Sequence, residues 1–130
     1  MVSLREGLML EGGGVVSLVG GGGKTSLMFN LARELSMAGD TVLTTTTTKI
    51  FEPSRDQTDC VILSGSVPDI LDRADELLDK HPHLTAAVGK LPESGKLYGF
   101  GPEIIGELWD AGLFQWILVE ADGAAGKPLK

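Results

Sequence analysis

The stretch Val15-Val-Ser-Leu-Val-Gly-Gly-Gly-Gly-Lys-Thr-Ser26 combines three features that together decide the fold expected of this chain. Its first five residues, Val15 to Val19, form a short apolar and β-branched run that is typical of a buried strand. Four consecutive glycines follow, Gly20 to Gly23. From Leu27 to Leu35 every fourth residue is leucine, as on one face of an amphipathic helix. The stretch therefore predicts a strand, a glycine-rich loop and a helix, in that order.

A loop of this composition is suited to binding phosphate. A phosphate needs backbone N–H groups that converge on it, and glycine permits this close approach because it has no Cβ. The start of the following helix adds unpaired N–H groups and a favourable dipole. Lys24 is then placed to reach the β- and γ-phosphates of a nucleotide, and the Thr25 hydroxyl to bind Mg²⁺. The predicted nucleotide-binding residues are Gly20, Gly21, Gly22, Gly23, Lys24, Thr25 and Ser26.

The loop departs from the commonest phosphate-loop sequence in one position. The Walker A pattern G-x-x-x-x-G-K-[ST] requires glycine at position 18, where this chain has Leu18. Counted back from Lys24 the loop reads G-x-x-G-K-T, with Gly20 and Gly23 as its glycines. In this it resembles the short phosphate loop of the peptide ligases that build cell-wall precursors and folate conjugates. A flexible glycine-rich turn is the alternative, but the order of strand, glycines, Lys-Thr and helix favours a phosphate loop.

A phosphate loop also needs an acid at the end of a neighbouring strand to hold the hydrated Mg²⁺. The apolar run Trp116 to Val119 ends in Glu120, and Asp122 follows two residues later. Either acid fits the metal role, and Asp122 fits equally the positioning of water or substrate. We expect Mg²⁺ to bind with ATP or GTP, held by Thr25 and Glu120. The predicted catalytic residues are Lys24, Glu120 and Asp122.

Two further groups of residues are candidates for contacts to substrate or phosphate. Thr44 to Thr48 follow the second predicted strand, and this run reflects either β-propensity or hydroxyls that face a ligand crevice at the carboxyl end of that strand. Near the end of the chain, Gly123 to Gly126 are small residues that allow a loop many backbone conformations. The lysine that follows them is either a phosphate contact or a solvated side chain. These second-tier candidates are Thr46, Thr47, Thr48, Lys49 and Lys127.

The rest of the chain repeats the alternation of strand and helix. Further strands are predicted at Thr41–Thr45, Cys60–Ser64, Thr85–Val88 and Trp116–Val119, and helices from Ser66 to Leu78 and from Glu103 to Leu113. This alternation indicates βαβ units on a parallel sheet. Residues 46–59 have no clean period and are predicted to be a loop. The expected fold is α/β, a P-loop NTPase-like parallel sheet with helices on both faces, in one nucleotide-binding domain over residues 1–130.

Composition excludes several classes of partner. The chain has 130 residues and a net charge of −7, with 18 acidic against 11 basic side chains. Nucleic-acid binding and a polybasic membrane patch are therefore not expected, because both depend on Lys and Arg. No apolar stretch approaches the length that spans a bilayer, and no signal peptide is recognised. A single cysteine, Cys60, suits a reducing compartment, so we expect a soluble cytoplasmic protein.

Two other groups of residues attract a functional interpretation and are judged structural. His81-Pro-His83 has the look of a metal-binding pair, but no cysteine accompanies it, and both histidines are expected at the surface. Cys60 lies inside a predicted strand and is expected to be a small buried hydrophobe rather than a nucleophile.

Three motifs together resemble the YqeC family. They are Val16-Ser-Leu-Val-Gly-Gly-Gly-Gly-Lys-Thr-Ser-Leu-Met28, the threonine run Thr44–Lys49 with Ile50, and Leu118-Val-Glu-Ala-Asp-Gly-Ala-Ala-Gly-Lys-Pro-Leu-Lys130. Members of that family are described as accessory factors for selenium-dependent molybdenum hydroxylases, or as selenium cofactor biosynthesis proteins. The resemblance implies a phosphate-loop protein that helps to equip such a hydroxylase with selenium. It also implies that family members continue past Lys130, so the sheet is expected to be incomplete at the C-terminus.

The leading functional prediction is therefore nucleotide binding with hydrolysis or phosphoryl transfer, in the maturation of the selenium cofactor of molybdenum hydroxylases. One alternative is an ATP-dependent ligase that activates a carboxylate, which the short phosphate loop suggests. Another is a nucleotide-gated binding or delivery protein with negligible turnover. The expected partners are a nucleoside triphosphate and, through the family resemblance, a selenium-dependent molybdenum hydroxylase or its maturation factors.

Overall fold

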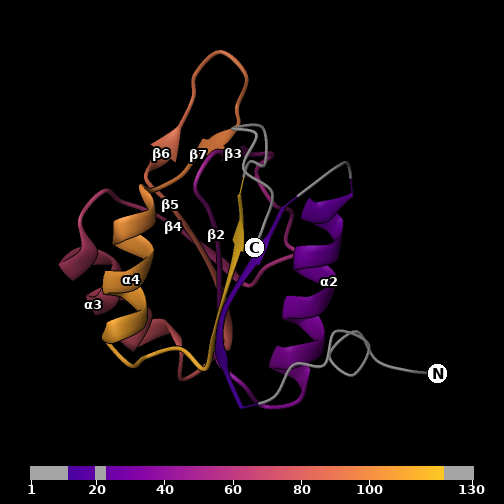
Figure 1. Cartoon of the computed structure of the whole chain (residues 1–130), viewed down its shortest axis with the longest axis vertical. Coiled ribbons are helices and arrows are strands. Elements are labelled where there is room, and N and C mark those ends of the chain that lie inside the picture. The colour runs from indigo at the N-terminus through magenta and orange to yellow at the C-terminus, as the bar shows by residue number, and fades with distance from the viewer. Residues whose placement is uncertain (1–11, 20–22, 122–130) are drawn as a thin grey trace.

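Five parallel strands form the centre of the part of the chain that the computed structural model describes, residues 12–19 and 23–121 (Figure 1). Every neighbouring pair in this sheet is parallel, as the alternation of strands and helices predicts. Across the sheet the strands are β1 (Gly14–Leu18), β8 (Trp116–Glu120), β2 (Val42–Thr46), β5 (His83–Ala87) and β4 (Cys60–Leu63).

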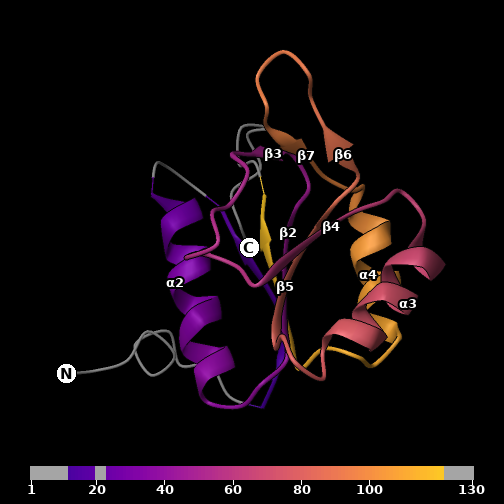
Figure 2. The same cartoon turned by 180° about the vertical axis from the view of Figure 1, so that it is seen from behind.

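Helices cover both faces of the sheet, which confirms the predicted α/β architecture. α2 (Lys24–Met37) lies on one face, and α3 (Val67–Leu77) and α4 (Pro102–Asp110) lie together on the other (Figures 1 and 2). α4 ends before the predicted Leu113, because Gly112 adopts a left-handed φ of 75° and closes a turn onto Trp109 O at 3.1 Å. None of the described helices combines the length and the apolar character needed to cross a membrane.

The central strands are buried throughout and the edge strands are not. All five residues of β2, of β5 and of β8 are buried, whereas every residue of β1 is half-buried or exposed and β4 has one buried residue, Ile62. Continuous burial explains why the sequences of β2 and β8 read as unbroken runs without polar alternation. β5 begins at His83, two residues before the predicted Thr85, because His83 and Leu84 pair in register with β2.

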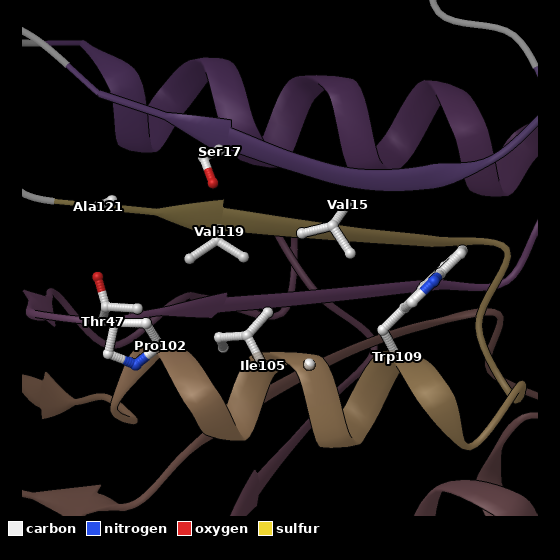
Figure 3. Close-up of a pocket in the computed structure, with 9 residues that line it drawn as sticks. Val15, Ser17, Thr47, Pro102, Ile105, Trp109, Val119 and Ala121 are labelled. Atoms are coloured by element: carbon white, nitrogen blue, oxygen red, sulfur yellow. The ribbon is translucent and has the colours of Figure 1, made fainter. Parts of the chain in front are cut away.

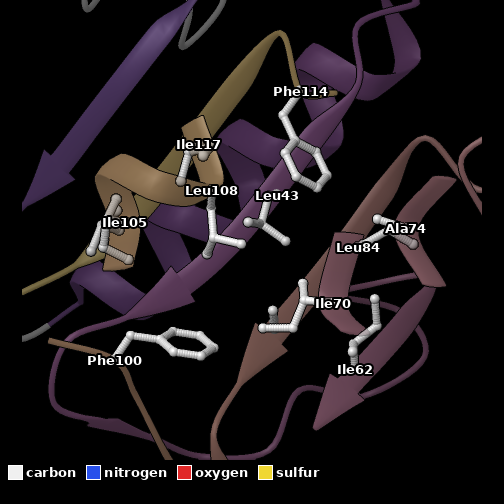
Figure 4. Packing of buried hydrophobic residues seen from close by; sticks show 12 residues of the cluster. Leu43, Ile62, Ile70, Ala74, Leu84, Phe100, Ile105, Leu108, Phe114 and Ile117 are labelled. Carbon is white, nitrogen blue, oxygen red and sulfur yellow. The ribbon is translucent and has the colours of Figure 1, made fainter. Parts of the chain in front are cut away.

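Two apolar clusters hold the layers together, one on each face of the sheet. Leu43 and Ile117 point to the face that α3 and α4 cover, where they join Ile70 and Leu108 (Figure 4). Their strand neighbours point the opposite way and pack against α2, since successive side chains of a strand alternate between faces. That second cluster contains Met28, Leu31, Leu35, Val42, Trp116 and Leu118.

A small antiparallel sheet lies beside the carboxyl ends of the main strands, and the sequence did not predict it. It consists of β3 (Lys49–Ile50), β7 (Leu97–Tyr98) and β6 (Gly89–Lys90), with β7 in the middle. The expectation that residues 46–59 form only a loop was therefore wrong at Lys49 and Ile50. A two-residue strand has no measurable period, and its partner is almost fifty residues away. Ile50 and Leu97 are nonetheless buried, and they extend the core beneath this sheet.

Candidate functional site

The start of α2 places the two polar side chains of the Lys-Thr pair at the carboxyl end of β1. Gly23 precedes the helix with φ 90° and ψ −6°, a left-handed conformation that L side chains rarely adopt. No side chain caps the first turn at this position, and the first turn contains no acidic residue. The N–H groups at the start of α2 are therefore not satisfied by a side-chain cap, as binding of an anion there requires.

Glu120 ends β8 next to this helix. In the sheet it is in register with Leu18 on one side and with Thr46 on the other. Glu120 is only 7% exposed, and its Oε1 accepts a hydrogen bond from the Thr25 hydroxyl. These residues are 95 positions apart in the chain, so the contact is made by the fold and not by local sequence.

Lys24 also reaches the end of β8. Its Nζ donates a hydrogen bond to the carbonyl oxygen of Ala121 at 3.1 Å, and the side chain is half-buried. A lysine amine and a threonine hydroxyl from the first turn of α2 thus lie beside the residues that close β8. The structure brings together Lys24, Thr25 and Glu120, three of the predicted site residues.

The threonine run divides into residues with different surroundings. Thr46 is fully buried: its hydroxyl donates to Glu120 O at 2.8 Å and accepts from Thr48 N at 3.0 Å. The N–H of Thr47 also donates to Glu120 O, at 3.1 Å. The hydroxyl of Thr46 therefore fastens the end of β2 to the end of β8. Lys49 is exposed and belongs to β3, where it pairs with Tyr98.

The remaining predicted site residues are placed as follows. Ser26 is exposed in the first turn of α2. Thr48 is half-buried and its carbonyl oxygen accepts from Gly99 N at 2.8 Å. Predictions that fall on Gly20, Gly21, Gly22, Asp122 and Lys127 lie outside the described residues.

Within the described part of the chain, no group of three or more His, Cys, Asp or Glu side chains gathers as a metal site. The donor set at the end of β8 is different in kind, a hydroxyl and one carboxylate. Mg²⁺ is commonly held in this way, by one or two carboxylates with the remaining positions taken by phosphates and water. Thr25 and Glu120 fit that requirement.

A buried polar network that sequence reasoning missed lies between β2 and β5. The hydroxyl of Thr44 is 2.9 Å from Nε2 of His83 and 2.7 Å from the hydroxyl of Thr85, which in turn donates to Thr58. His83 is 3% exposed, so the expectation that it lies at the surface was wrong. The buried ring has two partners: its Nε2 is within hydrogen-bond distance of the Thr44 hydroxyl, and the ring centroid of Phe29 lies 6.0 Å from its own.

Burial has a measurable consequence for the ring of His83. Desolvation lowers its pKa to about 4, although the nearby Asp59 carboxylate acts in the opposite direction. His83 opens β5, so this network sits at the amino end of the strand and away from Glu120. Cys60 is half-buried beside the core, and burial followed by the charge of Asp59 raises the pKa of its thiol. Neither group shares the surroundings of the Lys-Thr pair.

Comparison with known proteins gives two matches. The sequence model of the YqeC family, described as "YqeC protein", matches residues 16–130. An "Uncharacterized protein YqeC" from Escherichia coli (strain K12) is 40% identical over 121 residues, which cover 89% of this chain and 43% of the relative. The chain thus spans less than half the length of that relative. No solved structure matches the chain.

Proposed function

The chain belongs to the YqeC family, and from that premise and the geometry of the site we propose that it binds a nucleoside triphosphate with Mg²⁺ at the start of α2. The observation that carries the proposal is the contact between the Thr25 hydroxyl and the Glu120 carboxylate. A hydroxyl that follows a glycine-rich loop and an acid that ends a neighbouring parallel strand are the two protein groups that a P-loop protein uses for Mg²⁺.

Each residue has a distinct task in this proposal. The amine of Lys24, now hydrogen-bonded to Ala121 O, is the cation that contacts the β- and γ-phosphates. Thr25 and Glu120 would hold the metal, and the hydrogen bond between them keeps the two oxygens adjacent. When bound, Mg²⁺ neutralises charge on the phosphoryl group. Thr46 positions Glu120 by bonding to its carbonyl oxygen.

The reaction that we propose is hydrolysis or phosphoryl transfer in the maturation of the selenium cofactor of molybdenum hydroxylases. The support for the selenium role is the family resemblance, and the support for phosphate chemistry is the Lys24, Thr25 and Glu120 geometry. An ATP-dependent carboxylate ligase differs in needing an acceptor amine for turnover. A nucleotide-gated delivery protein differs in binding tightly without hydrolysis.

The experiment that tests the proposal is thermal unfolding with and without Mg-ATP and Mg-GTP. At one hundred times Kd, binding stabilises the native state by about 2.7 kcal/mol, a shift of several degrees in Tm. We expect a shift for the wild type with one of the two nucleotides and none for Lys24→Ala. Lys80→Ala is the matched control, since Lys80 is an exposed lysine between α3 and the amino end of β5, whereas Glu120 is at the carboxyl end of β8.

Two results would contradict the proposal. One is an equal Tm shift for the wild type and Lys24→Ala, which would place the nucleotide elsewhere. The other is a well-folded wild-type chain whose Tm moves with neither nucleotide at millimolar concentration.

A further inference from the structure

A groove runs along the face of the sheet that α4 covers. Its volume is about 380 Å³, and it lies between β1 and β8 on one side and α4 on the other (Figure 3). The walls are mainly apolar: Val15 and Val119 from the strands face Ile105 and Trp109 from the helix. Val15 is 42% exposed, an unusual fraction for a valine inside a strand that borders a core.

The strand that forms one wall of the groove is also an edge of the sheet. Among the described strands, β1 pairs with β8 alone, so its other edge carries unpaired backbone groups. The sequence of β1 is Gly-Val-Val-Ser-Leu, so the strand is mainly apolar and contains no charged side chain that would discourage pairing with another strand. Proteins usually blunt or cover such an edge. Among the residues that the structure describes, the groove and the edge are thus two adjoining surfaces on β1 that no other element covers.

The connections between strands show which face of the sheet a further unit would use. The chain moves away from β1 when it passes from β1 to β2, and the helix of that step, α2, lies on one face. It moves back toward β1 from β4 to β5 and from β5 to β8, and the helices of these steps, α3 and α4, lie on the opposite face (Figures 1 and 2). This reversal is what a constant right-handed crossover produces.

A step from β8 to a strand outside β1 continues in the same direction as the two steps before it. By the same rule its helix lies on the face of α3 and α4, next to α4 and over β1 and β8. That position is the groove lined by Val15, Val119, Ile105 and Trp109. We propose that the groove and the open edge of β1 are the docking surface for one further crossover unit, a helix followed by a parallel strand, from the carboxyl-terminal part of a longer YqeC-family chain.

The length of the relative supplies the source of this unit. The matched region is 43% of the E. coli protein, so more than half of that protein lies outside it. A helix with one apolar stripe fills the groove, and an apolar strand pairs with β1. A second copy of this chain is a poorer occupant, because each described helix already packs its apolar face against its own sheet. The inference does not depend on nucleotide binding.

Fluorescence of the two tryptophans tests the inference. Trp116 is 2% exposed and Trp109 is half-buried in the groove wall, so in the 130-residue chain acrylamide quenches mainly Trp109. The comparison protein is the same chain fused after Lys130 to whatever part of the E. coli relative follows its matched region. We expect at least a severalfold drop in the quenching constant of Trp109 in the fusion, assigned with Trp109→Phe, together with slower hydrogen exchange at β1.

A steric variant separates docking from folding. A Cβ added at Gly106 meets no atom within 4 Å, so Gly106→Leu is accommodated on α4 and projects into the groove that Gly106 lines. We expect this variant to leave the Tm of the 130-residue chain unchanged or higher, and to restore quenching of Trp109 in the fusion. Glu107→Leu, one position along α4 and outside the groove, is the matched control and keeps the protection.

Three outcomes would overturn the inference. The first is a fusion in which Trp109 and β1 are as accessible as in the 130-residue chain. The second is protection in the fusion that Gly106→Leu does not reduce. The third is a concentration-dependent dimer of the 130-residue chain that protects Trp109, which would make a second copy the occupant.

Discussion

Thr25 and Glu120 meet because the neighbouring parallel strands β1 and β8 end at the same edge of the sheet: Thr25 lies in the helix that follows β1, and Glu120 is the last residue of β8. Glu120 is only 7% exposed, and burying a carboxylate is costly unless a partner compensates its charge. The hydroxyl of Thr25 is one such partner, and the Mg²⁺ that we propose is a second. At the scale of single residues the site is therefore built around one acid. The amine of Lys24 lies one residue further along the same edge, at Ala121 O.

Replacing this acid separates metal binding from phosphate binding. Glu120→Gln keeps the shape and a carbonyl oxygen that accepts from Thr25, but it removes the charge that we propose attracts Mg²⁺. We expect nucleotide affinity in the presence of Mg²⁺ to fall on the order of tenfold or more, the usual effect of a lost charge-assisted contact. Affinity in EDTA is expected to change little. Isothermal titration measures both, with Glu76→Gln on the exposed face of α3 as control; equal losses in both conditions would move the metal role away from Glu120.

His83 makes the free energy of unfolding depend on pH. Its pKa is about 4 in the folded protein and about 6.5 in an unfolded chain. The unfolded state therefore binds the proton more readily, so the stabilisation is complete above pH 6.5 and is lost as the pH falls toward 4. Between pH 7 and pH 5 we expect a loss of about 2 kcal/mol. Urea unfolding at both pH values measures it, and a His83→Gln variant with the same pH dependence as the wild type would contradict the assignment.

At the scale of elements, two glycines have opposite roles. Gly99 passes directly over the end of β2, where a Cβ would lie 1.7 Å from Thr46 O, the acceptor of the Phe100 N–H at 3.0 Å. This crossing joins the small antiparallel sheet to the main sheet. Gly106, within α4, has open space around it. The same substitution at these positions therefore has contrasting effects.

Gly99→Ala is expected to destabilise the protein by about 2 kcal/mol or more, because a clash with backbone cannot be relieved by a rotamer change. Gly106→Ala is expected to stabilise it by roughly 0.5–1 kcal/mol through helix propensity. Both changes in the free energy of unfolding are measured by urea denaturation. Equal effects of the two substitutions would show that the crossing at Gly99 is less tight than the distance to Thr46 implies.

At the scale of the whole molecule, the two apolar clusters share the same strands. Leu43 and Ile117 belong to the cluster under α3 and α4, while their neighbours Val42 and Leu118 belong to the cluster under α2. A strand cannot leave one layer without leaving the other. We therefore expect the two layers to unfold together.

Truncation of one core residue in each layer tests this coupling. Ile70 of α3 and Leu31 of α2 are both fully buried, and Ile70→Ala and Leu31→Ala are each expected to cost about 2–5 kcal/mol. With Trp109 replaced by phenylalanine in both variants, the urea midpoint followed by Trp116 fluorescence, which then reports on the α2 layer, should equal the midpoint followed by circular dichroism. Separate midpoints in Ile70→Ala would show that the α3 and α4 layer unfolds independently.

Much of the fold was accessible from local patterns, and the reasons are visible in particular elements. α2 follows from its leucine spacing and Gly39, and α3 from Ser66, whose hydroxyl accepts from Asp69 N at 3.3 Å as an N-cap. β8 could be predicted from the sequence because a strand that is buried on both faces requires an unbroken apolar run. β3 was not predicted, since its partner β7 is almost fifty residues away, and β6 and β7 were not predicted because two residues show no period. His83 was misplaced because a histidine is compatible with a strand interior only once Thr44 is known to face it.

By itself the sequence determined the parallel α/β class, the glycine-rich loop before a helix, and an acid at the end of an apolar strand. These are local properties, because backbone conformation, capping and periodicity depend on residues within a few positions of one another. Only the tertiary structure decided that Thr25 contacts Glu120, that Thr46 bonds to the backbone of Glu120, and that a groove lies open beside β1. Strand order decides which distant residues become neighbours, and it results from the packing of all the layers at once.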